Sequence, residues 1–102
     1  MISEQLVDNA DEVAGFLSAI SNGKRLAIVC HLLESELSVG EIAEKVGLSQ
    51  SALSQHLAKL RGMNLVETRR DRQMIYYSCN SLQVKKIMMT LDSLFGAQAS
   101  GS

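Results

Sequence analysis

The fold follows from one stretch of this 102-residue chain, Ser38-Val-Gly-Glu-Ile-Ala-Glu-Lys-Val-Gly-Leu-Ser-Gln-Ser-Ala-Leu-Ser-Gln-His-Leu-Ala-Lys-Leu-Arg61. Ser38 and Glu41 have the spacing of a capping box, which predicts that a helix begins there. Gly47 stands where a helix ends in a left-handed residue, and Ser49 can cap a second helix. Two short helices joined by about three residues that include a glycine are typical of a helix-turn-helix.

The second of these helices has two distinct faces. Leu53, Leu57 and Leu60 form an apolar stripe. No acidic residue occurs from Leu48 to Leu65, and short hydroxyl and amide groups suit base edges and phosphates in a DNA major groove. The candidate DNA contacts on this helix are Ser49, Gln50, Ser51, Ser54, Gln55, His56, Lys59 and Arg61. By itself the helix is equally compatible with a solvated polar face.

A β-hairpin is predicted after this helix, over residues 65–70 and 73–78. Val66, Thr68, Ile75, Tyr76 and Tyr77 favour strands, and the charged segment between the two runs suits a hairpin tip. A hairpin in this place is a wing, whose candidate DNA contacts are Arg69, Arg70, Arg72 and Gln73. The alternative is a charged turn that only protects an edge strand.

The charge is distributed unevenly along the chain. The net charge is −1, which at first argues against nucleic acid. Residues 1–46, however, contain eight acidic and three basic residues, whereas residues 47–77 contain five basic and two acidic residues. This asymmetry favours one surface turned toward phosphates. No apolar run is long enough to span a membrane, no signal peptide is evident, and two cysteines without a leader suggest a reducing cytoplasm.

Helices are also expected at both ends, over residues 8–21 and from Asn80 or Ser81 to Phe95, with another over residues 24–34. The first and last helices carry apolar stripes that we expect to pair with a second copy in a two-fold dimer. The predicted interface comprises Val13, Phe16, Leu17, Ile20, Val84, Ile87, Met88, Leu91, Leu94 and Phe95. Packing within one protomer is the alternative. Residues 8–96 would form one domain between flexible termini at 1–7 and 97–102.

These segments resemble the ArsR/SmtB family of bacterial winged-helix repressors, in particular its NolR/HlyU-like branch. The resemblance runs from about Ala14 to Gly96 and is carried by residues 24–26, 36–41, 48–61, 68–71 and 75–78. It implies a mainly α fold with a small β-hairpin, that is, a winged helix-turn-helix of about five helices and a two-stranded wing. It also implies a homodimeric repressor, nucleoid-associated when bound to double-stranded DNA. Two symmetric reading helices match a palindromic operator.

Many members of that family sense metals or oxidants, and the corresponding positions predict no metal site here. Ser38 and Gly40 stand where metal-binding cysteines would be, and the last helix has Asp92 but no histidine. In the redox branch Cys30 would pair with a thiol at the position of Gly96, so the dithiol switch is broken. Cys30 is therefore interpreted as a small buried hydrophobic residue, with a single-thiol sensor as the alternative.

Enzymatic function is not expected. The chain has no phosphate-binding glycine loop and no nucleophile elbow. No cofactor is predicted either. The remaining alternative from another class is a winged helix that binds only other proteins, and the acid-free helix face argues against it.

Overall fold

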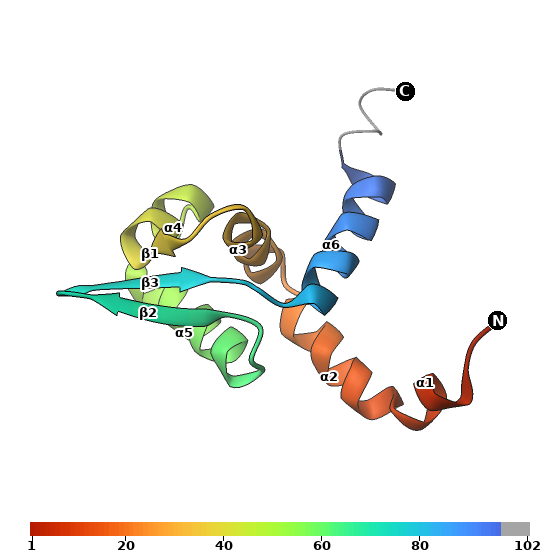
Figure 1. The fold of residues 1–102 in the computed structure, drawn as a ribbon. Helices are drawn as coiled ribbons and strands as arrows, with labels where there is room; N and C mark the ends of the chain where they lie inside the picture. Colours follow the sequence, from red (N-terminus) through yellow and green to blue (C-terminus); the bar gives the residue numbers. More distant parts are fainter. Residues whose placement is uncertain (97–102) are drawn as a thin grey trace.

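The computed structural model describes residues 1–96, and the predicted flexible segment 97–102 lies outside them. The prediction of a mainly α winged helix-turn-helix is confirmed (Figure 1). In chain order the elements are α1 (Glu4–Asp8), α2 (Ala10–Ile20), α3 (Gly23–Glu34), β1 (Leu37–Ser38), α4 (Val39–Val46), α5 (Gln50–Gly62), β2 (Glu67–Asp71), β3 (Met74–Ser78) and α6 (Leu82–Phe95).

The helix-turn-helix forms as its local signals predict. The Ser38 hydroxyl accepts from the backbone N–H of Glu41 at 3.3 Å, and the Glu41 carboxylate accepts from the backbone N–H of Ser38 at 2.8 Å. Gly47 ends α4 with φ of 70° and ψ of 43°, a left-handed conformation that glycine adopts without steric cost. The Ser49 hydroxyl then accepts from the backbone N–H of Ala52 at the start of α5.

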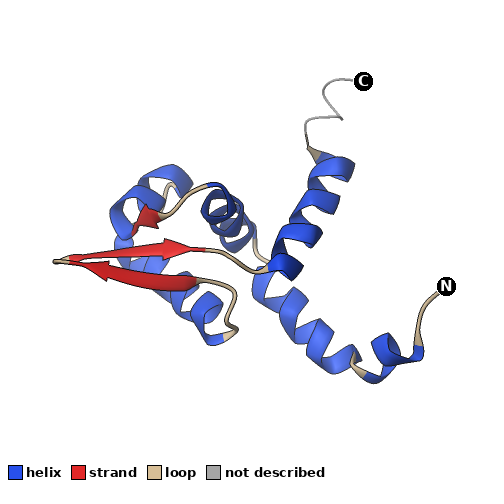
Figure 2. Ribbon diagram, in the orientation of Figure 1, coloured by secondary structure: helices blue, strands red, loops and turns tan. Residues whose placement is uncertain are grey.

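The wing belongs to a three-stranded antiparallel sheet of order β1-β3-β2 (Figure 2). The short strand β1 was not predicted, and it pairs with β3 through Leu37 opposite Tyr77 and Ser38 opposite Tyr76. Both wing strands were predicted, although β2 begins at Glu67 rather than at residue 65. Arg72 is the first residue of the two-residue turn between them and has a positive φ of 60°.

The core lies between α3, α4, α5 and the sheet. The leucine stripe of α5 is fully buried, as the sequence indicates. On α3 the buried residues are Ile28, Val29 and Leu32, so the predicted burial of Cys30 is wrong: Cys30 is exposed. Both sides of α3 are apolar, and its inner side is the one that packs against α4 and α5.

The helix predicted over residues 8–21 corresponds to α2, whereas the short helix α1 was not predicted and lies mostly within the segment 1–7 that was expected to be a flexible terminus. Ser3 caps α1, and Asn9 lies between α1 and α2 with non-helical dihedral angles. No residue of α1 is buried. The exposed Leu6 and Val7 on α1 therefore have little apolar cover within the protomer.

The helices α2 and α6 lie at the opposite end of the protomer from the wing tip (Figure 1). Three residues predicted for the dimer interface are instead buried in the core of the single chain: Ile20, Val84 and Met88. They face inward because they close the core beneath α2 and α6. The other predicted interface residues remain exposed or half-buried. A dimer through these helices would therefore use a narrower strip than the sequence suggests.

Candidate nucleic-acid interface

The polar face of α5 is exposed to solvent because the leucines on the opposite face of the helix are buried in the core. Leu53 and Leu60 are 0% exposed and Leu57 is 2% exposed, so the helix cannot rotate without losing core contacts. The opposite side chains are exposed: Ser49, Gln50, Ser51, Ser54, Gln55, Lys59 and Arg61. Seven of the eight predicted contacts on this helix therefore lie on one open surface.

Hydrogen bonds within α5 distinguish its hydroxyls from its amides. The Ser54 hydroxyl donates to the backbone carbonyl of Gln50 at 2.9 Å, and the Ser49 and Ser51 hydroxyls lie 3.3 Å apart. Within residues 1–96, no hydrogen bond engages the side-chain amides of Gln50 and Gln55. Because these amides can donate and accept, they are the groups on this face most available for base edges.

His56 is the exception on the predicted face, because it is half-buried. Its Nδ1 lies 3.4 Å from Nη1 of Arg25, a residue of α3. The imidazole therefore has a partner inside the protein on one side of its ring. Sequence reasoning missed Arg25, because the two residues are 31 positions apart in the chain.

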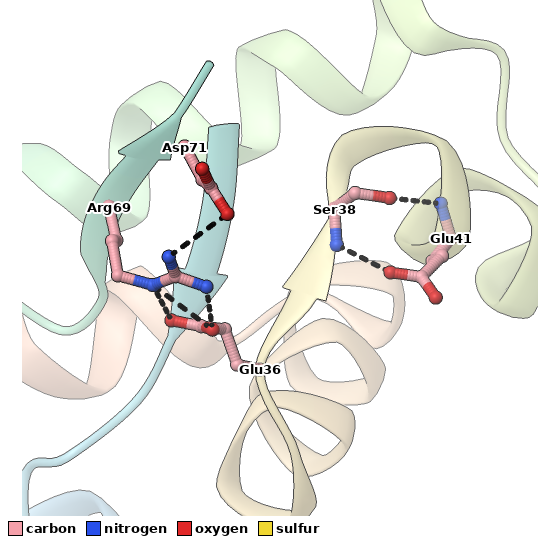
Figure 3. A network of polar contacts seen from close by, with 5 residues as sticks. All are labelled: Glu36, Ser38, Glu41, Arg69 and Asp71. Atoms are coloured by element: carbon pink, nitrogen blue, oxygen red, sulfur yellow. Dashed lines mark hydrogen bonds and ion pairs between the residues drawn. The ribbon is translucent and has the colours of Figure 1, made fainter. Parts of the chain in front are cut away.

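Arg69 is held by the protein itself (Figure 3). Its Nη2 lies 2.6 Å from Oε1 of Glu36, its Nε donates to both carboxylate oxygens, and its guanidinium lies 4.9 Å from the ring centroid of Tyr76. A weaker contact joins its Nη1 to Asp71 at 3.8 Å. The hydrogen bond from Arg69 holds the pKa of Glu36 below its usual range, and the same pair raises the pKa of Arg69.

The other wing residues are open to solvent. Arg70, Arg72 and Gln73 are exposed, and among the described residues no carboxylate forms an ion pair with Arg70 or Arg72. Within residues 1–96, the wing tip therefore presents two exposed guanidinium groups that form no ion pair. Arg69, in contrast, fastens the wing to the segment before β1 and is the wing arginine least free to contact a phosphate.

Cys30 has an environment that disfavours its thiolate. Although Cys30 is exposed, neighbouring atoms shield part of its side chain from water, and this desolvation is the first cause that raises the pKa of the thiol; the nearby Asp92 and Glu34 carboxylates raise it further. Its Sγ lies 3.9 Å from Sδ of Met88. Across residues 1–96, no three His, Cys, Asp or Glu side chains come together as a metal ion would require. In the same part of the chain, no helix is both long and apolar enough to cross a bilayer.

The fold and this surface together define a winged helix-turn-helix DNA-binding protein, and the comparisons with known proteins name its family. Residues 22–68 match the family described as "Bacterial regulatory protein, arsR family". The nodulation protein NolR of Rhizobium meliloti is 57% identical over 89 residues, which cover 87% of this chain and 73% of that protein. This chain belongs to the ArsR family of bacterial regulatory proteins, and it is a DNA-binding transcriptional regulator, not an enzyme.

Two other relatives are named for opposite effects on transcription, one as an activator and one as a repressor. The transcriptional activator HlyU of Vibrio cholerae is 44% identical over 92 residues, 90% of this chain and 85% of that protein. A biofilm growth-associated repressor of Xylella fastidiosa is 39% identical over 98 residues, 96% of this chain and 86% of that protein.

Solved structures show the same architecture. NolR from Sinorhizobium fredii superposes with a TM-score of 0.85 at 55% identity, covering 95% of this chain and 97% of that one. A homodimeric winged helix-turn-helix domain from Mycobacterium bovis gives 0.79 at 27% identity, covering 99% of this chain and 94% of that one.

Proposed function

We propose that this chain is a homodimeric repressor that binds a palindromic operator and so blocks a promoter. In this proposal α5 enters the major groove and the wing contacts the backbone or the minor groove. One observation carries it: the exposed face of α5 has no acidic residue, and its free amides lie on the same open surface as its basic last turn.

Within that interface we assign base reading and phosphate binding to different residues. Gln50 and Gln55 have free amides, which can form bidentate hydrogen bonds with adenine. Lys59, Arg61 and Arg72 supply positive charge for phosphates. The hydroxyls of Ser49, Ser51 and Ser54 are further donors for phosphate oxygens, although Ser49 and Ser51 already contact each other and the Ser54 hydroxyl would have to release the backbone carbonyl of Gln50.

The dimer in this proposal forms through α2 and α6. Leu17, Leu94 and Phe95 are exposed to 46%, 61% and 78%. Leaving these apolar side chains in water is unfavourable, and contact with a second copy would bury them. The half-buried members of the same faces are Val13, Phe16, Ile87 and Leu91. A two-fold axis through these helices would relate the two copies of α5 by the symmetry that an inverted repeat in DNA has.

A single-thiol switch at Cys30 is a second candidate. Exposure of the thiol favours it, whereas the raised pKa works against it, since the thiolate is the reactive form. Peroxide that leaves the DNA affinity of the wild type unchanged would exclude this switch.

The main proposal is tested by selecting bound sequences from a library of random duplexes. The expected product is an inverted repeat whose half-sites are about 10–10.5 base pairs apart, centre to centre, or a multiple of that spacing. Recovery of unrelated sequences, with affinity that disappears at high salt, would contradict specific recognition.

Fluorescence anisotropy with the selected duplex then tests the roles of individual residues. Gln55→Ala should lose discrimination at one base position, at a cost of about 1–3 kcal/mol. Arg72→Ala should weaken binding to most duplexes and reduce the salt dependence. Lys85→Ala is the matched control, because it removes one positive charge from α6, away from the proposed DNA interface, and Lys85 is not among the residues of the proposed dimer interface. If all three variants lost the same DNA affinity, the loss would reflect a general effect of charge or folding, and the roles assigned to Gln55 and Arg72 would be wrong.

A further inference from the structure

Arg25 joins three helices through one side chain. It lies in the first turn of α3, and its Nε donates to the backbone carbonyl of Ala19 at 2.6 Å. Its Nη2 donates to the carbonyl of Ser18 at 3.3 Å, and its Nη1 contacts Nδ1 of His56 at 3.4 Å. The guanidinium thus bridges the last turn of α2 and the DNA-recognition helix α5.

The two contacts with α2 fix the plane of this guanidinium. The last carbonyls of a helix lie at the negative end of its dipole, so a cation is favoured there. The carbonyl of Ser18 also accepts from the backbone N–H of Ser21 at 3.3 Å and from its hydroxyl at 2.9 Å. A guanidinium is planar, and two of its nitrogens are committed to Ser18 and Ala19. The direction of the third, toward His56, is therefore set by the end of α2.

This contact also determines which ring nitrogen of His56 carries the proton. A guanidinium has only donors, so Nδ1 of His56 must be the acceptor and carry no hydrogen. The neutral ring then has its hydrogen on Nε2. Because the two nitrogens lie on opposite sides of the ring, Nε2–H points away from Arg25. His56 follows Gln55 at the edge of the exposed face of α5.

We propose that Arg25 is a positioning residue for DNA recognition: it ties His56 to the end of α2 and holds it in the Nε2–H form, which donates a hydrogen bond to an acceptor on DNA. This inference rests on the proposed function of α5. It gives a role in DNA binding to a residue outside the helix-turn-helix, and it connects the recognition helix to α2, which we assign to the dimer interface.

The first test is made without DNA. Nitrogen-15 NMR of the free wild-type protein, at a pH where its imidazoles are neutral, distinguishes the two ring forms of His56. The expected signature is a protonated Nε2 and an unprotonated Nδ1, with a shift toward a mixture of the two forms in Arg25→Met. A proton on Nδ1 in the wild type would overturn the proposal even if the variant does not fold.

The second test is a double-mutant cycle on operator affinity. Arg25→Met should weaken binding about tenfold in the wild type, and far less in a His56→Ala background. Lys24→Met is the matched control. It removes a cation from the same turn of α3 and a 2.7 Å hydrogen bond from Nζ to the carbonyl of Val46, but no contact with His56.

The outcomes separate this inference from the proposed function. Equal losses from Arg25→Met in both backgrounds would show that Arg25 does not act through His56, and would overturn the inference while operator binding stands. Failure of the wild type to bind any selected operator would instead overturn the proposed function, and with it the role of Arg25 in recognition. The Lys24→Met effect should be the same in both backgrounds.

Discussion

The wing tip should show opposite effects on stability and on DNA binding when Arg72 is replaced by glycine. Arg72 has a φ of 60°, in the region that side chains with a Cβ rarely adopt. That conformation costs an L-residue about 1–2 kcal/mol, of which the extra freedom of glycine in the unfolded chain offsets about 0.5–1 kcal/mol. Arg72→Gly should therefore raise the free energy of unfolding by about 0.5–1 kcal/mol.

The same substitution should weaken DNA binding. Each phosphate contact contributes about 0.9 to the slope of log affinity against log salt. A dimer has two wing tips, so the slope should fall by about two in magnitude. The expected gain in stability corresponds to about 4 °C in Tm, measured by thermal denaturation at one fixed protein concentration.

Asn64→Gly is the matched control, because Asn64 has a φ of 59° but lies between α5 and β2, away from the wing tip. It should stabilise less, since asparagine tolerates this conformation, and should leave the salt slope unchanged. Two results would refute the reasoning. A slope unaltered in Arg72→Gly would remove the tip from the phosphate contacts, and a lower Tm would mean that the backbone there is not strained.

Three further substitutions or reactions have defined outcomes. Glu36→Gln should raise operator affinity about twofold at low salt, measured by fluorescence anisotropy. The reason is that it frees Arg69 and removes a negative charge beside the wing. An unchanged affinity would mean that Arg69 does not reach DNA. Gly47→Ala should lower the free energy of unfolding by about 1 kcal/mol or more in chemical denaturation, because Gly47 has a φ of 70°. Gly62→Ala is the control and should be neutral or stabilising, because nothing lies within 4 Å of the added Cβ. In a single-cysteine variant at pH 8.5, iodoacetamide should alkylate Cys30 more slowly than free cysteine, because its raised pKa leaves less thiolate; faster alkylation would restore the sensor hypothesis.

The parts of the fold that the sequence predicts are those with local signals. The capping box at Ser38 and the left-handed Gly47 each depend on residues at most four positions apart, and both form as expected. Strand β1 has no such signal. It is two residues long, and it exists because Tyr76 and Tyr77 of β3 supply its partners.

The spacing of apolar residues does not predict which face of α3 is buried. Its apolar residues surround most of the helix, so a stripe through Cys30 and a stripe through Ile28 are both compatible with helical spacing. Packing against α4 and α5 decides between them, and that information lies outside the helix. For the same reason the apolar spacing of α6 does not separate core residues from surface residues, since Val84 and Met88 belong to the core of one protomer.

The sequence predicts which residues of the candidate site are exposed, but not which residues hold them in place. The exposed face of α5 and the charged wing tip could be read from the sequence. The supporting residues could not, because Arg25 meets His56 across 31 positions and Arg69 meets Glu36 across 33. Charged residues this far apart in a chain have many possible partners, and only the folded arrangement selects one.

Ser38 places a constraint on how such a regulator can diversify. It is the last residue of β1, opposite Tyr76, and also the cap of α4, so no spacer separates the sheet from the helix-turn-helix. An insertion there would shift the strand register or break the cap. At the turn between Asp71 and Met74, by contrast, extra residues would only lengthen the hairpin. Descendants of this chain can therefore vary the length and sequence of the wing turn while the connection between β1 and α4 at Ser38 stays unchanged.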